Sequence, residues 1–232
     1  MKTSLKEKIK KSWNWLWNSD SLLSYVVFLA IIFVIIKFIF LPGLGLIFGT
    51  QLPLAIVESS SMEHYSLQYN NNDNNYVLCD KTFNEQKFFS KEEYWNACGN
   101  WYEQNTNITK SQFENFKLSN GFRKGDLMII FGKSADKLKV GDVIIFNANR
   151  NYPIIHRLIS LDPIQTKGDH NSGQLNEEKN IQQSQIIGVA VAKIPKVGWV
   201  KLFVFEHKIL SLIILIIIII IYMLWPKKKD NF

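Results

Sequence analysis

Two long apolar stretches constrain this chain more than any other feature of its sequence. Residues 22 to 41 form a run of twenty residues with one charge, Lys37, and residues 209 to 225 form an uncharged run of seventeen. As helices they would span about 30 Å and about 25 Å, against a bilayer core of about 30 Å. The first run is also too long for a cleaved signal peptide and lacks a small-residue cleavage site. We therefore expect two transmembrane helices, the first of them a retained signal anchor.

The lysines that flank the two runs predict the orientation of the chain. Basic segments next to membrane helices remain on the cytoplasmic side. We therefore expect residues 1 to 21 and residues 226 to 232 to be cytoplasmic, and residues 42 to 208 to form a domain on the opposite face. The flanking lysines are Lys2, Lys6, Lys8, Lys10, Lys11, Lys227, Lys228 and Lys229, and the expected aromatic belts contain Trp13, Trp15, Trp17, Tyr222 and Trp225.

Charge and cysteine content exclude some classes of partner. The formal net charge is +7, but anionic headgroups account for the eight flanking lysines, and the remainder is near neutral. We therefore expect no nucleic-acid binding. Cys79 and Cys98 both lie in the outward segment, where they could form a disulfide or remain as two buried thiols. No motif for a metal or an organic cofactor is found, and none is expected.

The outward segment divides into parts of different composition. Residues 42 to 51 contain Pro42 and three glycines, which predict that the first helix ends or bends there. Residues 52 to 57 are typical of a strand. Residues 63 to 122 are rich in asparagine and aromatic residues and are interpreted as an insert, with helix starts at two capping-box spacings, Ser90 to Glu93 and Thr109 to Gln112. We expect a small lobe that either covers the substrate groove or merely packs on the sheet. Its expected core contains Trp95, Trp101, Phe113 and Phe116.

Residues 124 to 194 predict a mainly β core. Gly125-Asp126 and Gly141-Asp142 each precede a short apolar run, so both are expected to be turns that open buried strands. Two further strands are predicted over residues 153 to 160 and 186 to 194.

Several motifs occur in a fixed order along the outward segment. A predicted strand leads into Ser59-Ser60-Ser61-Met62, and the later blocks follow in sequence. In this order, and next to an apolar anchor, they resemble the signal peptidase I family (peptidase family S26), in its histidine-type branch. The later blocks are Lys124-Gly125-Asp126, Gly141-Asp142-Val143-Ile144-Ile145-Phe146, His156-Arg157 and Gly168-Asp169-His170-Asn171.

The resemblance implies roles for individual residues. Ser61 would be the nucleophile and His156 its general base, while Ser59 and the backbone of Ser61 would bind the oxyanion. Asp169 is the expected partner that orients the imidazole, but family members often carry further aspartates downstream that this chain lacks. We therefore keep Glu177 as an alternative acid. Strand alternation places His156 and Arg157 on opposite faces, and His64 is a less favoured base.

The fold and function expected from the resemblance are specific. The fold is a mainly β catalytic domain of the signal peptidase/LexA-like type, with a small α-containing insert and two transmembrane helices. The activity is that of a serine endopeptidase removing signal peptides from exported preproteins. The implied partners are preprotein signal peptides and the lipid bilayer, and association with the translocation machinery stays open. The predicted location is a plasma membrane, with an archaeal source as first choice.

Two other functions are compatible with the sequence. The first is an inactive relative that binds signal peptides or serves as a subunit of a translocation complex, favoured by the missing downstream aspartate. The second is a surface-binding or structural protein held by two anchors, favoured by the large aromatic insert.

Overall fold

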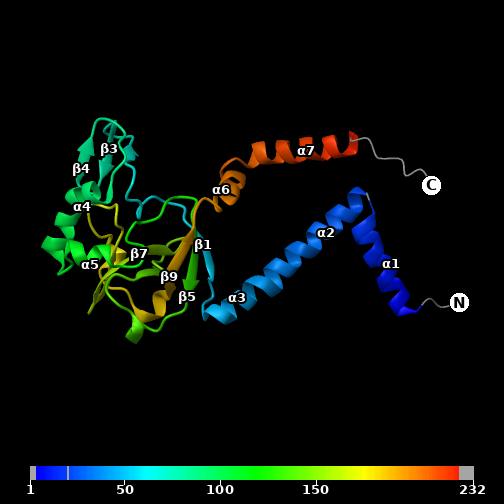
Figure 1. Ribbon diagram of the computed structural model, residues 1–232, viewed down its shortest axis with the longest axis horizontal. Helices are drawn as coiled ribbons and strands as arrows, with labels where there is room; N and C mark the ends of the chain where they lie inside the picture. Colours follow the sequence, from blue (N-terminus) through cyan, green and yellow to red (C-terminus); the bar gives the residue numbers. More distant parts are fainter. Residues whose placement is uncertain (1–3, 20, 225–232) are drawn as a thin grey trace. The chain divides into compact units, whose positions relative to one another are not determined.

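The computed structural model describes residues 4 to 19 and 21 to 224 and divides the chain into two compact units. The first unit contains residues 1 to 44 and 203 to 232, and the second contains residues 45 to 202. Figure 1 labels the helices and strands of both units. Lys2, Trp225 and Lys227 to Lys229, used above to predict the orientation, lie outside the described residues.

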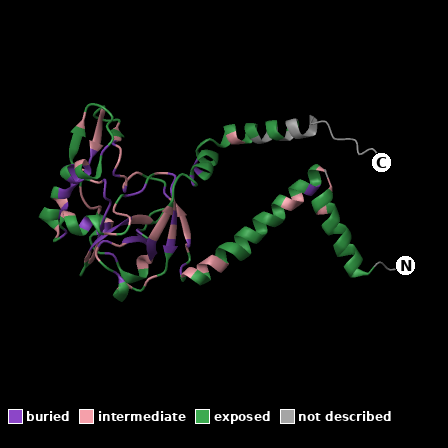
Figure 2. Ribbon diagram, viewed as in Figure 1, coloured by how far each residue is buried: buried purple, intermediate pink, exposed green. Residues whose placement is uncertain are grey.

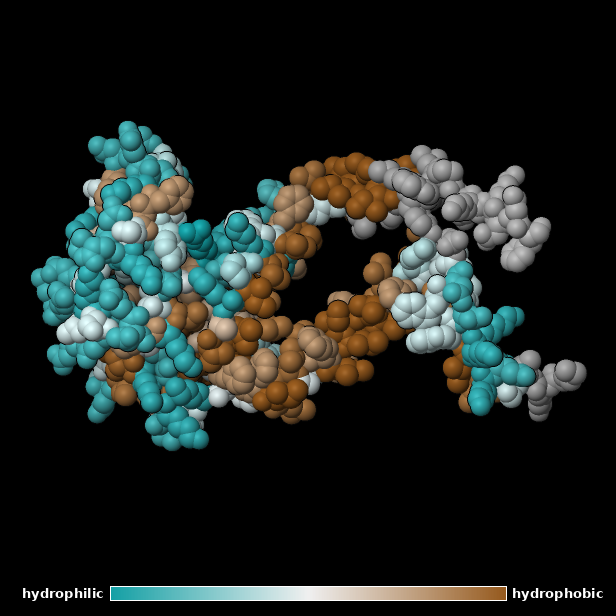
Figure 3. Space-filling view, viewed as in Figure 1, coloured by the Kyte–Doolittle hydropathy of each residue, from teal (hydrophilic) through white to brown (hydrophobic). Residues whose placement is uncertain are grey.

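The first unit is helical. Helix α1 (Leu5–Asn18) precedes a continuous helical stretch composed of α2 (Leu22–Ile35), the π-helical segment η1 (Ile36–Phe40) and α3 (Leu41–Phe48). At 27 residues and a mean hydropathy of 2.8, Leu22–Phe48 is the one helix among the described residues that is long and apolar enough to cross a membrane. Figure 3 shows the apolar side chains along it. Helices α6 (Trp199–Glu206) and α7 (Lys208–Leu224) end the described chain, and α7 covers most of the second apolar run.

The prediction that the first helix ends within residues 42 to 51 is confirmed. The helix continues past Pro42 and ends at Phe48, directly before Gly49, whose φ angle is 66°. Proline in a helix has no N–H and its ring collides with the carbonyl oxygen four residues earlier. Here the wider π-helical turns of η1 (Ile36–Phe40) come directly before α3. We infer that these wider turns accommodate Pro42 without ending the helix.

The second unit is mainly antiparallel β structure. Its six-stranded sheet has the order β1-β5-β9-β6-β7-β8, and every pair of neighbours is antiparallel. Four of the six strands match the runs predicted from residue 124 onward, and β1 matches the run after the first helix. The bounds are β1 (Leu54–Ile56), β5 (Leu127–Phe131), β6 (Val143–Phe146), β7 (Ile154–Leu161), β8 (Ile164–Lys167) and β9 (Ile186–Ile194).

Strand β6 is the most buried strand of this sheet, and Figure 2 colours the ribbon by burial. All four residues of β6 are buried. Val143 and Ile145 belong to one hydrophobic cluster, whereas Ile144 and Phe146 belong to another. Because successive strand residues point to opposite faces, β6 lies between two apolar layers.

The two Gly-Asp turns have the same local structure. Gly125 and Gly141 have φ angles of 88° and 94°, a region that favours glycine. In each turn the aspartate carboxylate accepts a hydrogen bond from the backbone N–H three residues earlier, at 3.0 Å for Asp126 and 3.0 Å for Asp142. Both predicted turns are therefore confirmed as the starts of β5 and β6.

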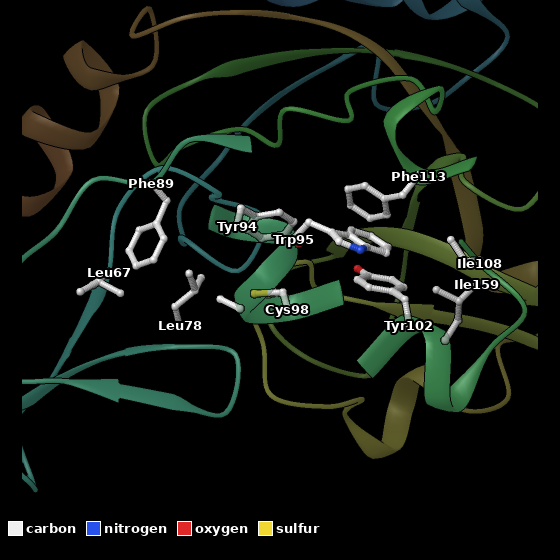
Figure 4. Close-up of a cluster of buried hydrophobic side chains, with 11 residues drawn as sticks. Leu67, Leu78, Phe89, Tyr94, Trp95, Cys98, Tyr102, Ile108, Phe113 and Ile159 are labelled. Atoms are coloured by element: carbon white, nitrogen blue, oxygen red, sulfur yellow. The ribbon is translucent and has the colours of Figure 1, made fainter. Parts of the chain in front are cut away.

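The segment from 63 to 122 forms a lobe with its own core. It contains the three-stranded sheet β2 (Gln68–Asn70), β3 (Asn75–Leu78) and β4 (Lys81–Phe83), followed by α4 (Lys91–Asn105) and α5 (Lys110–Glu114). Both predicted capping boxes are present. Cys79 and Cys98 form a disulfide that ties the end of β3 to α4. The lobe packs on β7 through Ile159. Figure 4 shows the core of the lobe, which includes Trp95 and Phe113. Trp101 and Phe116 pack against this core.

We expect the capping box of α4 to contribute measurably to stability. The hydroxyl oxygen of Ser90 accepts the N–H of Glu93 at 3.2 Å, so Ser90→Ala should lower the free energy of unfolding by about 1 kcal/mol. Ser111→Ala, an exposed position within α5, should change it by less than about 0.5 kcal/mol. Chemical denaturation of the full chain in detergent measures both values. Equal effects of the two substitutions would contradict the assigned cap.

Candidate functional site

Ser61 lies in a turn whose backbone is held from two sides. Ser61 lies five residues after the end of β1, and the N–H of Glu63 closes the turn by donating to the carbonyl of Ser60 at 2.9 Å. The N–H of His170 donates to the carbonyl of Ser61 at 2.8 Å. Ser61 is half-buried.

Three side chains form a continuous line of hydrogen bonds. The hydroxyl oxygen of Ser61 lies 2.8 Å from Nε2 of His156 on β7. Nδ1 of His156 lies 2.5 Å from Oε1 of Glu178, in the 3-10 turn η3 (Asn176–Glu178). His156 is 4% exposed and Glu178 is fully buried, so bulk water does not compete for the bond between them.

Glu178 is itself fixed by two further donors. The Thr166 hydroxyl on β8 donates to Oε1 at 3.0 Å, and the N–H of Leu175 donates to Oε2 at 2.7 Å. A carboxylate at Nδ1 retains a proton on that nitrogen, which leaves Nε2 free to accept the proton of a serine hydroxyl. The arrangement can therefore generate a nucleophilic serine oxygen.

Ser59 places a second hydroxyl next to that of Ser61. The two hydroxyl oxygens are 3.2 Å apart, and the side chain of Ser59 is exposed. The Ser59 hydroxyl can rotate, and at this distance it can donate a hydrogen bond to an atom of a group bound to the Ser61 oxygen. The hydroxyl of the intervening Ser60 instead accepts a bond from Gln68 at 2.7 Å.

Asp169 does not contact His156, contrary to the expected pairing. Its carboxylate accepts bonds from Arg157 Nη2 at 2.7 Å, His64 Nε2 at 2.8 Å and the Tyr102 hydroxyl at 2.8 Å. The reason is the alternation of β7. His156 and Arg157 point to opposite faces, and Asp169 lies on the face of Arg157.

The charges around Asp169 account for its protonation state. Burial alone would raise the pKa of the Asp169 carboxyl, but the Arg157 guanidinium and the His64 hydrogen bond outweigh burial and hold that pKa far below its usual value. Burial lowers the pKa of His64, despite its bond to Asp169. A neutral His64 therefore donates to the carboxylate and is not placed to accept a proton from Ser61.

Glu177, the predicted alternative acid, points away from the imidazole and pairs with Arg150 at 2.7 Å. The adjacent Glu178 makes the contact with His156 instead. The prediction named Glu177 alone, so the sequence analysis missed Glu178, although it lies directly after Glu177 in the chain. Which of the two glutamates faces His156 depends on the direction of each side chain in the 3-10 turn, and no residue pattern specifies that direction.

Gly168 is required by the close approach of its loop to the imidazole. A Cβ atom at residue 168 would lie 2.8 Å from Nε2 of His156 and 2.5 Å from the amide of Asn171. Any side chain there would displace the base or the loop.

Across the part of the chain that the structure describes, no group of three or more His, Cys, Asp or Glu side chains could hold a metal ion.

Lys167 is a buried cation beside the site. Its ammonium donates to the Gly168 carbonyl at 3.0 Å and lies 4.9 Å and 5.0 Å from the ring centroids of Trp101 and Tyr102. Burial lowers the pKa of Lys167 to about 8, although Asp169 and Glu178 oppose that change.

Comparisons with known proteins agree with the motif order. The chain is 32% identical over 107 residues to the signal peptidase complex catalytic subunit sec11 of Sclerotinia sclerotiorum. It is 30% identical over 107 residues to that of Verticillium alfalfae and 28% over 108 residues to that of Zygosaccharomyces rouxii. The matches cover 40% of this chain and 62%, 62% and 64% of the relatives. No protein-family model matches the chain.

The chain thus spans less than two thirds of the length of the curated relatives it matches. The similarity confirms the predicted resemblance to the signal peptidase I family. All three relatives are fungal, and they give no support to an archaeal source.

The lowered pKa of Lys167 predicts how stability changes with pH. Between about pH 8 and 10.5 the unfolded chain retains the Lys167 proton that the folded chain has lost, so this group makes the free energy of unfolding rise with pH. The rise should total about 3 kcal/mol across this range. Lys167→Met should lack it, as denaturation in detergent at several pH values can measure. Parallel curves for the two proteins would contradict the assignment.

Proposed function

We propose that the chain is a membrane-bound serine endopeptidase that removes signal peptides from exported preproteins, as its resemblance to signal peptidase catalytic subunits suggests. The observation that carries the proposal is the line of hydrogen bonds from Ser61 through His156 to Glu178, at 2.8 Å and 2.5 Å. Serine, imidazole and carboxylate in this order are the groups that acyl transfer needs.

In the proposed mechanism, Nε2 of His156 takes the hydroxyl proton of Ser61 while the serine oxygen attacks the scissile carbonyl carbon. Glu178 holds the imidazole in the required tautomer and stabilises the imidazolium cation. Collapse of the tetrahedral intermediate breaks the peptide bond, and His156 returns the proton to the leaving amine. Water then attacks the acyl-enzyme, again with His156 as base.

The oxyanion would be bound by the backbone N–H of Ser61 and the hydroxyl of Ser59. Both groups lie at the serine turn, and the two hydroxyl oxygens are already 3.2 Å apart. The backbone N–H is held in place before the reaction and would stabilise the developing negative charge without a cost of reorganisation, whereas the Ser59 hydroxyl would rotate toward it.

The substrate would bind as an extended strand along β1, which lies at one edge of the six-stranded sheet. An edge strand offers free backbone groups for pairing with a peptide. The chain runs from β1 into the serine turn within five residues. A peptide paired with β1 would therefore reach Ser61, with small side chains filling two shallow pockets.

The membrane arrangement in the proposal has two crossings. Helix Leu22–Phe48 supplies one, and α7 with the rest of the apolar run supplies the other. Both termini would be cytoplasmic and the second unit would face outward. A membrane anchor brings enzyme and preprotein together at one depth, which raises their effective concentration.

The main argument for an inactive relative no longer holds. That alternative was favoured because the chain lacks the downstream aspartate expected in the family. Glu178 provides a carboxylate beside the imidazole. The structure gives no separate observation that favours the surface-binding reading.

The first test is cleavage of a purified preprotein by the full chain in detergent. Ser61→Ala and His156→Ala should each lower kcat/KM on the order of 10⁴-fold, because both groups take part in bond breaking. His64→Gln is a useful comparison, since His64 contacts Asp169 and not Ser61, and should retain activity well above these two variants. Binding of preprotein without cleavage by the unaltered chain would favour the inactive relative.

A matched pair of neighbouring residues tests the third group. Glu178→Gln should lower kcat on the order of 10³-fold, because an amide cannot hold the imidazolium as a carboxylate does. Glu177→Gln removes the same charge one residue away, where the side chain bonds Arg150, and should change kcat by less than about twofold. Similar losses in both variants would show that net charge, and not the contact with His156, explains the effect.

A further inference from the structure

One face of α4 is turned toward the loop that follows β8. Tyr94, Cys98 and Tyr102 recur at intervals of four residues, which places them on one side of a helix. All three are 3% exposed or less. Figure 4 shows them along the helix within the core of the lobe.

Each member of this stripe reaches the loop of residues 168 to 171. The Tyr94 hydroxyl donates to the backbone carbonyl of Asp169 at 2.9 Å, and the Tyr102 hydroxyl donates to its carboxylate at 2.8 Å. Cys98 acts through its disulfide partner, because the N–H of Cys79 donates to the carbonyl of His170 at 2.9 Å. Two tyrosines and a covalent bridge thus hold two consecutive residues of the loop.

The opposite side of the same loop contacts the reactive groups. The N–H of His170 donates to the carbonyl of Ser61 at 2.8 Å. Gly168 passes so close to Nε2 of His156 that a Cβ would lie 2.8 Å away. The loop is therefore a single layer of chain between α4 and the Ser61–His156 pair.

His64 forms a second link between the stripe and the serine turn. It lies three residues after Ser61, donates to Asp169 at 2.8 Å and stacks on Tyr94 with ring centroids 3.9 Å apart. Burial raises the pKa of Tyr94 and Tyr102 well above that of free tyrosine, and the charge of Asp169 raises it further. Both hydroxyls therefore remain protonated donors.

We infer that α4 is a positioning element for the reaction proposed above: through Tyr94, Tyr102 and the Cys79–Cys98 bridge it holds the 168–171 loop against Ser61 and His156. Tyr94 and Tyr102 are positioning residues, since they act through the loop and touch no reacting atom. The inference rests on the proposed function for its catalytic consequence, but the contact itself can be measured without activity.

The test uses Tyr102→Phe and the double variant Tyr94→Phe/Tyr102→Phe in the full chain. Loss of these hydroxyls leaves the ring packing in place but frees the loop, so kcat should fall about tenfold in the single variant and further in the double, with KM within about twofold. Tyr69→Phe is the control, because its hydroxyl bonds Asn74 within the β2–β3 hairpin of the same lobe.

Hydrogen exchange provides the readout that needs no substrate. Backbone amides in peptides covering 168 to 171 and 59 to 63 should exchange faster in Tyr102→Phe than in the unaltered chain, and at unchanged rates in Tyr69→Phe. If the unaltered chain cleaves no preprotein, the proposed function fails, and faster exchange still supports the contact. Unchanged exchange and unchanged kcat would overturn the inference. A raised KM at constant kcat would also overturn it, by showing that the lobe acts on substrate binding.

Discussion

The buried ion pair between Arg157 and Asp169 is the interaction on which the rest of the second unit depends. Both side chains are fully buried. A buried charge is tolerated only when it is paired and its remaining hydrogen-bonding groups are satisfied. All five N–H groups of the guanidinium find acceptors: those not used by Asp169 donate to the carbonyls of Lys117, Leu118 and Gly141 at 3.0 to 3.1 Å. One side chain therefore fixes the end of the inserted lobe, the turn before β6 and the loop after β8.

The same strand also determines where chemistry can occur. Because His156 precedes Arg157 on β7, alternation directs the base away from the ion pair and toward Ser61. The two carboxylates consequently have separate environments. Asp169 is neutralised by Arg157, whereas Glu178 is bound by a hydroxyl and a backbone N–H and remains available to the imidazole. A carboxylate already paired with a guanidinium would stabilise an imidazolium less well than one held by neutral donors.

Features fixed by a few neighbouring residues could be predicted from the sequence, whereas features fixed by distant contacts could not. The Gly-Asp turns and the capping box at Ser90 depend on three or four consecutive residues, and both are present. The approach of Ser61 to His156, 95 residues apart, was inferred only from the resemblance. Whether Glu177 or Glu178 contacts His156 depends on the direction in which the 3-10 turn points each side chain. The role of Asp169 depends on which face of β7 its loop packs against, and that face carries Arg157.

The lobe between Met62 and Phe122 can be accommodated because its two ends meet. The N–H of Phe122 donates to the carbonyl of Met62 at 2.9 Å. The lobe therefore enters and leaves the domain at one point, as a short loop would. The entropy cost of closing such a loop grows only slowly with its length, and the lobe offsets that cost with its own aromatic core. An insert anchored only at its ends could move without consequence for the site. This one also binds Asp169 from α4 and supplies carbonyls to Arg157. Its motion is therefore coupled to the loop beside Ser61, which gives a physical reason to regard it as part of the site.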